Sequence, residues 1–171
     1  MNIMKRIAVV LGAGGVGVSL LVAACDRKAD AAAAATPVAV VGSSSAATAT
    51  YTIELKPAAS YKKGVEGTFE VIVKTKGEYH VNEEYPTKLT PEKVPEVTYA
   101  QPKLEKLKDP TAFALTKCGA GSKDSCTMVV TVKFTPQAGA TKVAAVLSFG
   151  VCNKDSCQIE KKTLDADIKV N

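Results

Sequence analysis

The residues of this 171-residue sequence that could form a chemical site are its five cysteines: Cys25, Cys118, Cys126, Cys152 and Cys157. The single histidine, His80, leaves no Ser/His/Asp or Cys/His arrangement with a convincing base and no histidine cluster for a metal. Thiols can instead accept a lipid, form disulfides or exchange electrons. We therefore expect neither hydrolytic catalysis nor a bound metal or cofactor.

The first cysteine ends a segment that has the three parts of a secretory signal. Lys5 and Arg6 form a short cationic region, residues 7–24 are uncharged, and small residues lead into Cys25. The string LVAAC resembles the lipobox of bacterial lipoproteins. We predict a signal peptide over residues 1–24 and a lipidated, palmitate-bearing Cys25 that holds the chain to a membrane, facing the periplasm, with inner or outer membrane undetermined. The alternative is an uncleaved transmembrane anchor, since eighteen uncharged residues could just cross a bilayer.

Two features of the sequence argue against nucleotide and nucleic-acid binding. Gly12, Gly14 and Gly17 have the G-x-G-x-x-G spacing of a dinucleotide-binding turn, but no helix, second strand or acidic residue follows at the required distance. The net charge of +5 falls to +3 once Lys5 and Arg6 leave with the signal peptide, and the remaining basic residues alternate with acidic ones. We expect neither nucleotides nor nucleic acids as partners.

The elements that must position the other cysteines are short strands. Residues 25–50 are almost all Ala, Ser, Thr, Gly and Val, which predicts a flexible tether after the lipid. Apolar residues then alternate with polar ones in five runs: Tyr51, Ile53, Leu55; Phe69, Val71, Val73; Met128, Val130, Val132, Phe134; Val143, Ala145, Leu147, Phe149; Leu164, Ala166, Ile168, Val170. A period of two indicates half-buried strands. We predict an all-β domain over residues 51–171, an antiparallel immunoglobulin-like β-sandwich.

The last four cysteines fall into two local pairs. Cys152 and Cys157 flank Asn-Lys-Asp-Ser, which is hairpin-loop material, so the two residues should lie opposite each other at about 4.5 to 5.5 Å between Cα atoms. Cys118 and Cys126 flank seven loop residues in the same way. Bridges that close such short loops stabilise a fold by only about 2 to 2.6 kcal/mol. Spacing alone leaves both an exchange site and an inert staple open.

Four segments between residues 70 and 170 carry a family resemblance: GEYHV at 77–81, LTPE at 89–92, AGAT at 138–141, and FGVC followed by four residues and Cys157. Together they resemble the N-terminal periplasmic, immunoglobulin-like domain of the thiol:disulfide interchange protein DsbD. The resemblance implies that Cys152 and Cys157 form a reversible disulfide. We take Cys152 as the nominal nucleophile, but either sulfur can be attacked, depending on exposure and leaving-group pKa. It also implies a capping loop with an aromatic residue, for which Phe113 is the candidate.

The sequence also departs from that family. Four residues separate the cysteines where five are usual, Gln158-Ile159 stands where prolines commonly follow, and Cys118 and Cys126 have no counterpart, so we assign that pair a structural role. The family's transmembrane electron carrier and C-x-x-C domain are not in the sequence, and we expect electrons to come from separate periplasmic thiol-disulfide oxidoreductases. Whether the chain is an enzyme stays open. The alternative is a non-catalytic binding or scaffolding lipoprotein with two structural disulfides.

Overall fold

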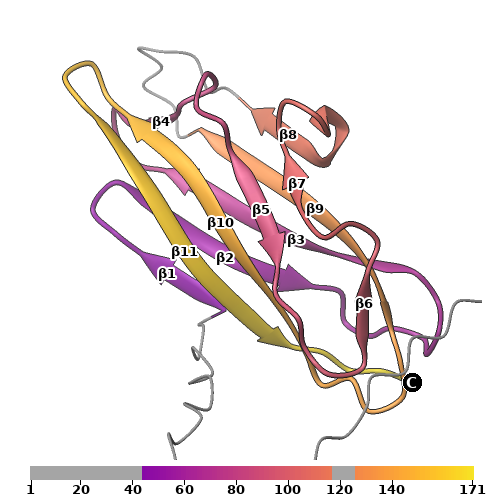
Figure 1. Ribbon diagram of the computed structural model, residues 1–171. Helices are drawn as coiled ribbons and strands as arrows, with labels where there is room; N and C mark the ends of the chain where they lie inside the picture. Colours follow the sequence, from indigo (N-terminus) through magenta and orange to yellow (C-terminus); the bar gives the residue numbers. More distant parts are fainter. Residues whose placement is uncertain (1–43, 117–125) are drawn as a thin grey trace, which may run out of the picture. The chain divides into compact units, whose positions relative to one another are not determined.

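A computed structural model describes residues 44–116 and 126–171 of the chain. These residues form eleven strands and one 3-10 turn (Figure 1). The elements are β1 Ser45–Ala47, β2 Tyr51–Pro57, β3 Gly67–Thr75, β4 His80–Val81, β5 Lys88–Pro91, β6 Val97–Tyr99, β7 Leu104–Glu105, the 3-10 turn η1 Pro110–Ala112, β8 Phe113–Thr116, β9 Thr127–Pro136, β10 Lys142–Cys152 and β11 Cys157–Asp167. Within these two segments no helix is long and apolar enough to cross a membrane.

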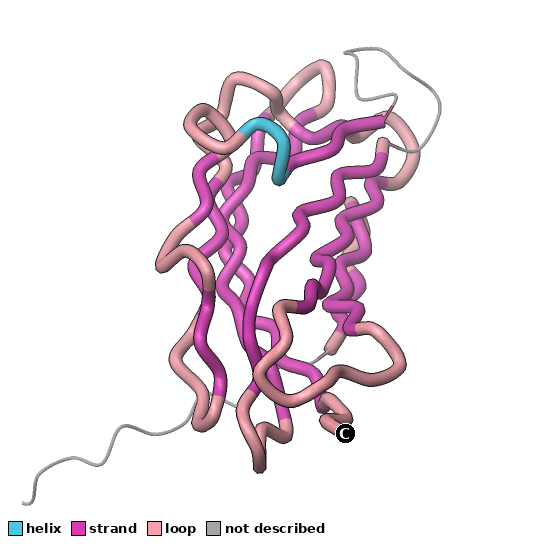
Figure 2. Tube along the Cα trace, turned by 90° about the vertical axis from the view of Figure 1, so that its right-hand side faces the viewer, coloured by secondary structure: helices cyan, strands magenta, loops and turns pink. Residues whose placement is uncertain are grey.

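The strands form two antiparallel sheets that face each other (Figure 2). The first sheet has the order β1-β2-β3-β9-β6, and β8 also pairs with β9. The second has the order β11-β10-β5-β7, and β4 also pairs with β10. The predicted fold class, an all-β antiparallel sandwich, is confirmed.

The core lies between the sheets and consists of the alternating apolar residues that the sequence predicted. Val71 and Val73 of β3 and Leu147 and Phe149 of β10 are fully buried. Burying each such side chain contributes about 1.5 to 3 kcal/mol. The rings of Tyr51 and Phe149 meet edge to face across the core with centroids 5.1 Å apart. The alternation therefore fixes which face of each strand points inward and which faces outward.

A partly buried polar contact accompanies this ring pair. The hydroxyl of Tyr51 donates a hydrogen bond of 2.9 Å to Oε2 of Glu160 on β11. Burial of the ring and the neighbouring carboxylate both raise the pKa of Tyr51 above its ordinary value. Tyr51 therefore stays neutral and ties the first sheet to the second, just inside the hairpin formed by β10 and β11.

The first strand lies inside the segment predicted as a tether. Ser45, Ala46 and Ala47 pair with residues 52–54 of β2 although none has a large apolar side chain, because a backbone ladder does not need one. The following turn is held by Thr48, whose Oγ1 accepts hydrogen bonds from the backbone N–H groups of Thr50 and Tyr51. The sheet thus starts before residue 51. The rest of the predicted tether, the signal peptide and Cys25 lie outside the described residues.

The edge of β10 that faces away from β11 receives two short strands in turn. β4 pairs with Val151 and Cys152, and β5 pairs with residues 145–148. Six residues, 82–87, connect these strands opposite only Phe149 and Gly150. Such an excess cannot stay in the ladder, so the segment bulges out of the sheet. We call residues 82–87 the cover loop.

Candidate functional site

The candidate site is the end of the β10–β11 hairpin. Cys152 and Cys157 are register partners and are joined by a disulfide, as their spacing predicted. Their Cα atoms are 4.0 Å apart, closer than the expected 4.5 to 5.5 Å. The next pair along the loop, Asn153 and Ser156, makes the backbone hydrogen bond, which places the cysteines at a non-hydrogen-bonded position, where opposing residues approach most closely.

The loop beyond the disulfide is ordered by one asparagine side chain. Oδ1 of Asn153 accepts hydrogen bonds from the backbone N–H groups of Asp155, at 3.0 Å, and Ser156, at 2.8 Å. This is the local bonding for which asparagine is favoured in turns. Lys154 and Asp155 at the tip form an exposed ion pair of 2.8 Å, which contributes little to stability. The four residues between the cysteines therefore form a defined turn.

The two sulfur-bearing residues differ in exposure. Both lie on the outer face of the second sheet, because Phe149 and Val151 alternate with them and point into the core. Cys152 is only 3% exposed, whereas Cys157 on the edge strand β11 is exposed. A partner thiolate can therefore reach Cys157 and not Cys152. The sequence-based choice of Cys152 as nominal nucleophile stays a prediction, and the difference in exposure favours attack at Cys157 instead.

The cover loop buries Cys152 from outside. A Cβ at Gly150 would lie 3.1 Å from Cβ of Tyr85 and 3.2 Å from Cβ of Asn82, so the loop packs directly against the backbone of β10. Any larger residue at this position would require the loop to shift by a few tenths of an ångström. Tyr85 is half-buried, and Glu83 and Glu84 remain exposed. The loop that covers the disulfide is thus the segment between β4 and β5.

Phe113, the residue proposed as the aromatic of a capping loop, is elsewhere. It begins β8, pairs with Val130 of β9 in the first sheet and is 6% exposed within the core. The expectation is wrong because the residues after η1 continue as a strand and turn the ring inward. The aromatic residue of the cover loop is Tyr85, whose Cβ packs against Gly150, in a stretch whose charged Glu-Glu-Tyr sequence gave no apolar signal.

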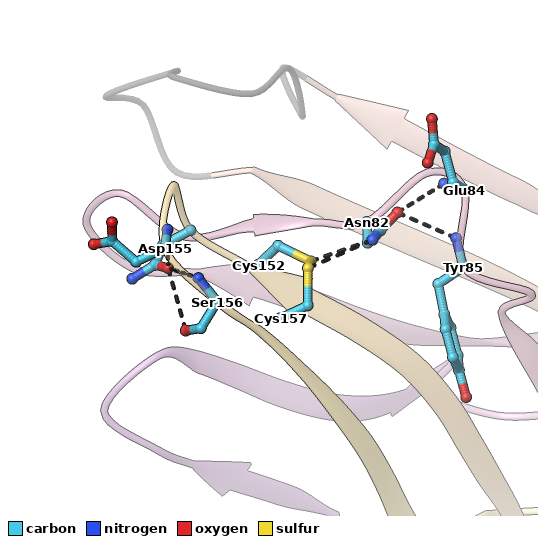
Figure 3. Close-up of a disulfide and its surroundings, with 8 residues drawn as sticks. Asn82, Glu84, Tyr85, Cys152, Asp155, Ser156 and Cys157 are labelled. Atoms are coloured by element: carbon cyan, nitrogen blue, oxygen red, sulfur yellow. Dashed lines mark hydrogen bonds between the residues drawn. A yellow bond between two sulfur atoms is a disulfide. The ribbon is translucent and has the colours of Figure 1, made fainter.

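Asn82, at the start of the cover loop, contacts the disulfide directly. Its Nδ2 donates to Sγ of Cys152 at 3.2 Å and lies 3.7 Å from Sγ of Cys157 (Figure 3). Its Oδ1 accepts hydrogen bonds from the backbone N–H groups of Glu84, at 2.8 Å, and Tyr85, at 3.1 Å. Sequence reasoning missed this residue. An asparagine directly after a strand is a turn signal, but nothing in the sequence aims its amide at a sulfur.

His80 also lies beside the disulfide, at the register position opposite Cys152 on β4. Its Nδ1 is buried, and in the described part of the chain it has no hydrogen-bond partner. Sequence reasoning did not assign His80 a role as a base or a metal ligand. The topology places it on the side of Cys152 opposite Cys157.

Cys126 is in a different environment. It is disulfide-bonded and fully buried at the start of β9, where its backbone N–H donates to Oγ1 of Thr75 at 3.0 Å. Its Sγ accepts a hydrogen bond of 3.5 Å from the backbone N–H of Val81. Cys118, its predicted partner, lies outside the described residues. Cys126 therefore belongs to the core, where solvent and partner proteins have no access.

Charged groups near the hairpin include both signs. Glu83 and Glu84 are exposed on the cover loop, and Nζ of Lys106 donates to the backbone carbonyl of Glu83 at 2.9 Å. Across residues 44–116 and 126–171, no three His, Cys, Asp or Glu side chains lie together as metal ligands would. The chemistry that the described groups support is that of an accessible disulfide.

No protein-family model and no curated protein sequence matches the chain. Among the solved structures that resemble it are two periplasmic or fimbrial proteins. The N-terminal periplasmic domain of ScsB from Proteus mirabilis is 11% identical with a TM-score of 0.34, and the match covers 71% of this chain and 47% of that one. AggA, the major subunit of aggregative adherence fimbriae type I from Escherichia coli, is 11% identical with a TM-score of 0.31, covering 73% and 98%. The chain thus spans about half the length of the ScsB domain structure.

Proposed function

We propose that this protein is a membrane-anchored thiol-disulfide exchange protein of the bacterial cell envelope, which accepts electrons through the Cys152–Cys157 disulfide. The observation that carries the proposal is the unequal exposure of the two cysteines. An exchange disulfide needs one sulfur that a partner can attack and a second that leaves as a thiolate. Exposed Cys157 and covered Cys152 meet these two needs.

The surface around Cys157 supports docking of a partner. Ile159 is 70% exposed and lies on the same face of β11, two residues beyond the cysteine and opposite Gly150. An isolated exposed isoleucine is ordinary, but this one adjoins the reactive sulfur and gives a partner an apolar contact at the place of reaction. The partner that supplies electrons is a separate dithiol protein of the periplasm, in line with the sequence resemblance to DsbD.

A thiol-trapping measurement tests the exchange role. The mature domain is equilibrated in graded glutathione buffers, free thiols are alkylated, and the Cys152–Cys157 and Cys126 bridges are read separately by mass spectrometry. We expect the Cys152–Cys157 bridge to open at a distinctly less reducing potential than the Cys126 bridge. Structural disulfides are reduced only at potentials below about −300 mV. If the Cys152–Cys157 bridge also stays oxidised until the buffer reaches that range, exchange is not its function.

A trapping pair tests the roles of the two cysteines. Cys152→Ser leaves Cys157 as a free thiol that can attack the disulfide of an oxidised dithiol partner. No Cys152 thiol remains to resolve the mixed disulfide, so covalent complexes should accumulate. Cys157→Ser leaves only the covered Cys152 and should trap far fewer. Equal trapping by both variants would contradict the assignment of Cys157 as the attacked residue.

The anchoring part of the proposal rests on the sequence of residues 1–25. Cys25→Ala should abolish labelling by a fatty-acid probe and leave a precursor of higher mass. Unchanged labelling and mass would show that the chain is not a lipoprotein. This result is independent of the thiol measurements.

A further inference from the structure

The hydrogen bonds of Asn82 allow only one of the two possible orientations of its side-chain amide. Its acceptor side meets two backbone N–H groups, those of Glu84 and Tyr85, which can only donate. Turning the amide over would set its NH2 group against both donors. The oxygen therefore faces the loop, and the NH2 group must face the sulfurs of Cys152 and Cys157.

This orientation matters little while the disulfide is closed, because a disulfide sulfur is a weak acceptor. When the bridge opens, one sulfur becomes a thiolate. Hydrogen bonds to an ionised acceptor are roughly twice as strong as those between neutral groups. The sulfur that needs such a bond is Cys152, since burial at 3% exposure removes water that would otherwise solvate its thiolate.

We propose that Asn82 is a catalytic residue of the exchange reaction, and that it stabilises the Cys152 thiolate by donating a hydrogen bond from Nδ2. The inference rests on the proposed exchange function and specifies how the site performs it. The cover loop then has a chemical role beyond shielding, because its first turn holds the donor in place before the sulfur acquires charge.

The electrons balance as follows. A thiolate of a dithiol partner attacks Sγ of Cys157 and forms a mixed disulfide, while the Cys152–Cys157 bond breaks and its electron pair leaves on Sγ of Cys152. Asn82 donates to that thiolate. The partner's second thiolate then attacks its own sulfur in the mixed disulfide and releases the Cys157 thiolate. The partner ends as a disulfide, and its two thiol protons complete the thiols of Cys152 and Cys157.

The test replaces the donor while keeping the turn. In Asn82→Asp a carboxylate oxygen can still accept from Glu84 and Tyr85, but an acceptor faces the sulfurs in place of the NH2 group. The matched control is Asn153→Asp, which makes the same change in the second asparagine turn, on the other side of Cys152. The readouts are the equilibrium constant for reduction by dithiothreitol and the pH dependence of Cys152 alkylation in the Cys157→Ser background.

We expect Asn82→Asp to lower the equilibrium constant for reduction about tenfold, which for this two-electron couple is about 30 mV, and to move Cys152 alkylation to higher pH. Asn153→Asp should change the constant less than threefold. Asn82→Ala, which removes the donor without adding charge, should change it in the same direction as Asn82→Asp. The inference would be overturned if Asn82→Asp and Asn153→Asp changed the equilibrium constant equally, or if Asn82→Ala did not change it.

These measurements are separable from the test of the proposed function. The dithiothreitol equilibrium reports on the sulfurs and Asn82 even if no protein partner exists. If the equilibrium shifts and Cys152→Ser traps no partner, Asn82 keeps its role and protein exchange fails. If partners are trapped and the equilibrium does not shift, exchange stands and the role of Asn82 fails. Unfolding of each oxidised variant in urea identifies any that is misfolded.

Discussion

Two cysteine environments of this protein differ although their sequences look alike. Cys126 and Cys157 each follow the string Lys-Asp-Ser, and each has a second cysteine a few residues before it. Cys126 is fully buried and disulfide-bonded, whereas Cys157 is exposed beside a cover loop. The comparison teaches that the position of a cysteine in the sandwich, and not its local sequence, decides whether its own sulfur is accessible.

One two-residue strand, β4, serves both environments. Val81 points into the core, and its backbone N–H donates to Sγ of Cys126. His80 and the following Asn82 lie beside Cys152 on the outer face. Because neighbouring residues of a strand point to opposite faces, three consecutive residues supply a backbone donor to one sulfur and a side-chain donor to another. A fixed backbone donor suits a permanent bridge, and an amide next to a covered cysteine suits one that opens.

The largest expected difference between the two environments is in stability. Cys126→Ala removes a native disulfide and leaves a cavity in the core, so the free energy of unfolding should fall by about 3 to 5 kcal/mol. The double variant Cys152→Ala/Cys157→Ala removes a bridge that closes a loop of six residues and should lose only about 2 kcal/mol. Urea unfolding at one pH measures both. An equal loss would mean that the hairpin disulfide is as structural as that of Cys126.

The second prediction concerns the cover loop. Gly150→Ala places a Cβ at 3.1 to 3.2 Å from Tyr85 and Asn82 and pushes the loop away from β10, at a cost of about 1 to 2 kcal/mol. Because Asn82 moves from the sulfurs, the equilibrium constant for reduction should fall about threefold. The control is Gly64→Ala, which costs about 1 kcal/mol because φ is 69° but meets no neighbour within 4 Å. If Gly64→Ala alters the redox equilibrium equally, lost stability and not the loop is the cause.

Much of the fold was predictable because the five long runs alternate strictly. Phe69, Val71 and Val73 are inward as expected, and the Cys152–Cys157 pairing follows from a four-residue loop between two such runs. The short strands β4 to β7 were not predicted. A strand of two to four residues carries too little periodicity to recognise, and its existence depends on a distant pairing partner: β10 for β4 and β5, β5 for β7, and β9 for β6.

The same limit explains what was missed at the site. The position of Asn82 depends on β4 and β5 pairing with one edge of β10, which forces residues 82–87 out of the sheet. Phe113 was placed in a capping loop only by the family resemblance, whereas pairing with β9 makes it part of the core. Long-range strand pairing, which no local pattern contains, set both outcomes.

The third prediction separates protein partners from small thiols. Ile159→Ser removes the apolar contact next to Cys157 and should slow exchange with a dithiol protein about two- to fivefold, because an interface loses a buried side chain. Reduction by dithiothreitol, which needs no such contact, should not change. Leu107→Ser is the control, since Leu107 is 76% exposed but lies in the segment after β7. Slower reduction by both reagents would mean that Ile159 affects the disulfide itself.

The smallest expected effect lies at the far edge of the same sheet, on β7. Lys103 and Lys108 pair with the Glu105 carboxylate and lower its pKa to about 2, from an ordinary value near 4.5. A lowered pKa means that the contribution to stability is present above pH 4.5 and is lost as the pH falls toward 2. Wild-type protein should therefore lose more stability over this interval than Glu105→Gln, measured by urea unfolding at each pH.

The reduction equilibrium of Cys152–Cys157 at neutral pH should be the same in both proteins, because Glu105 makes no contact with the cysteines. A shift in that equilibrium would show that β7, through the hydrogen bond from the backbone N–H of Lys106 to the carbonyl of Thr87, holds the cover loop over the disulfide.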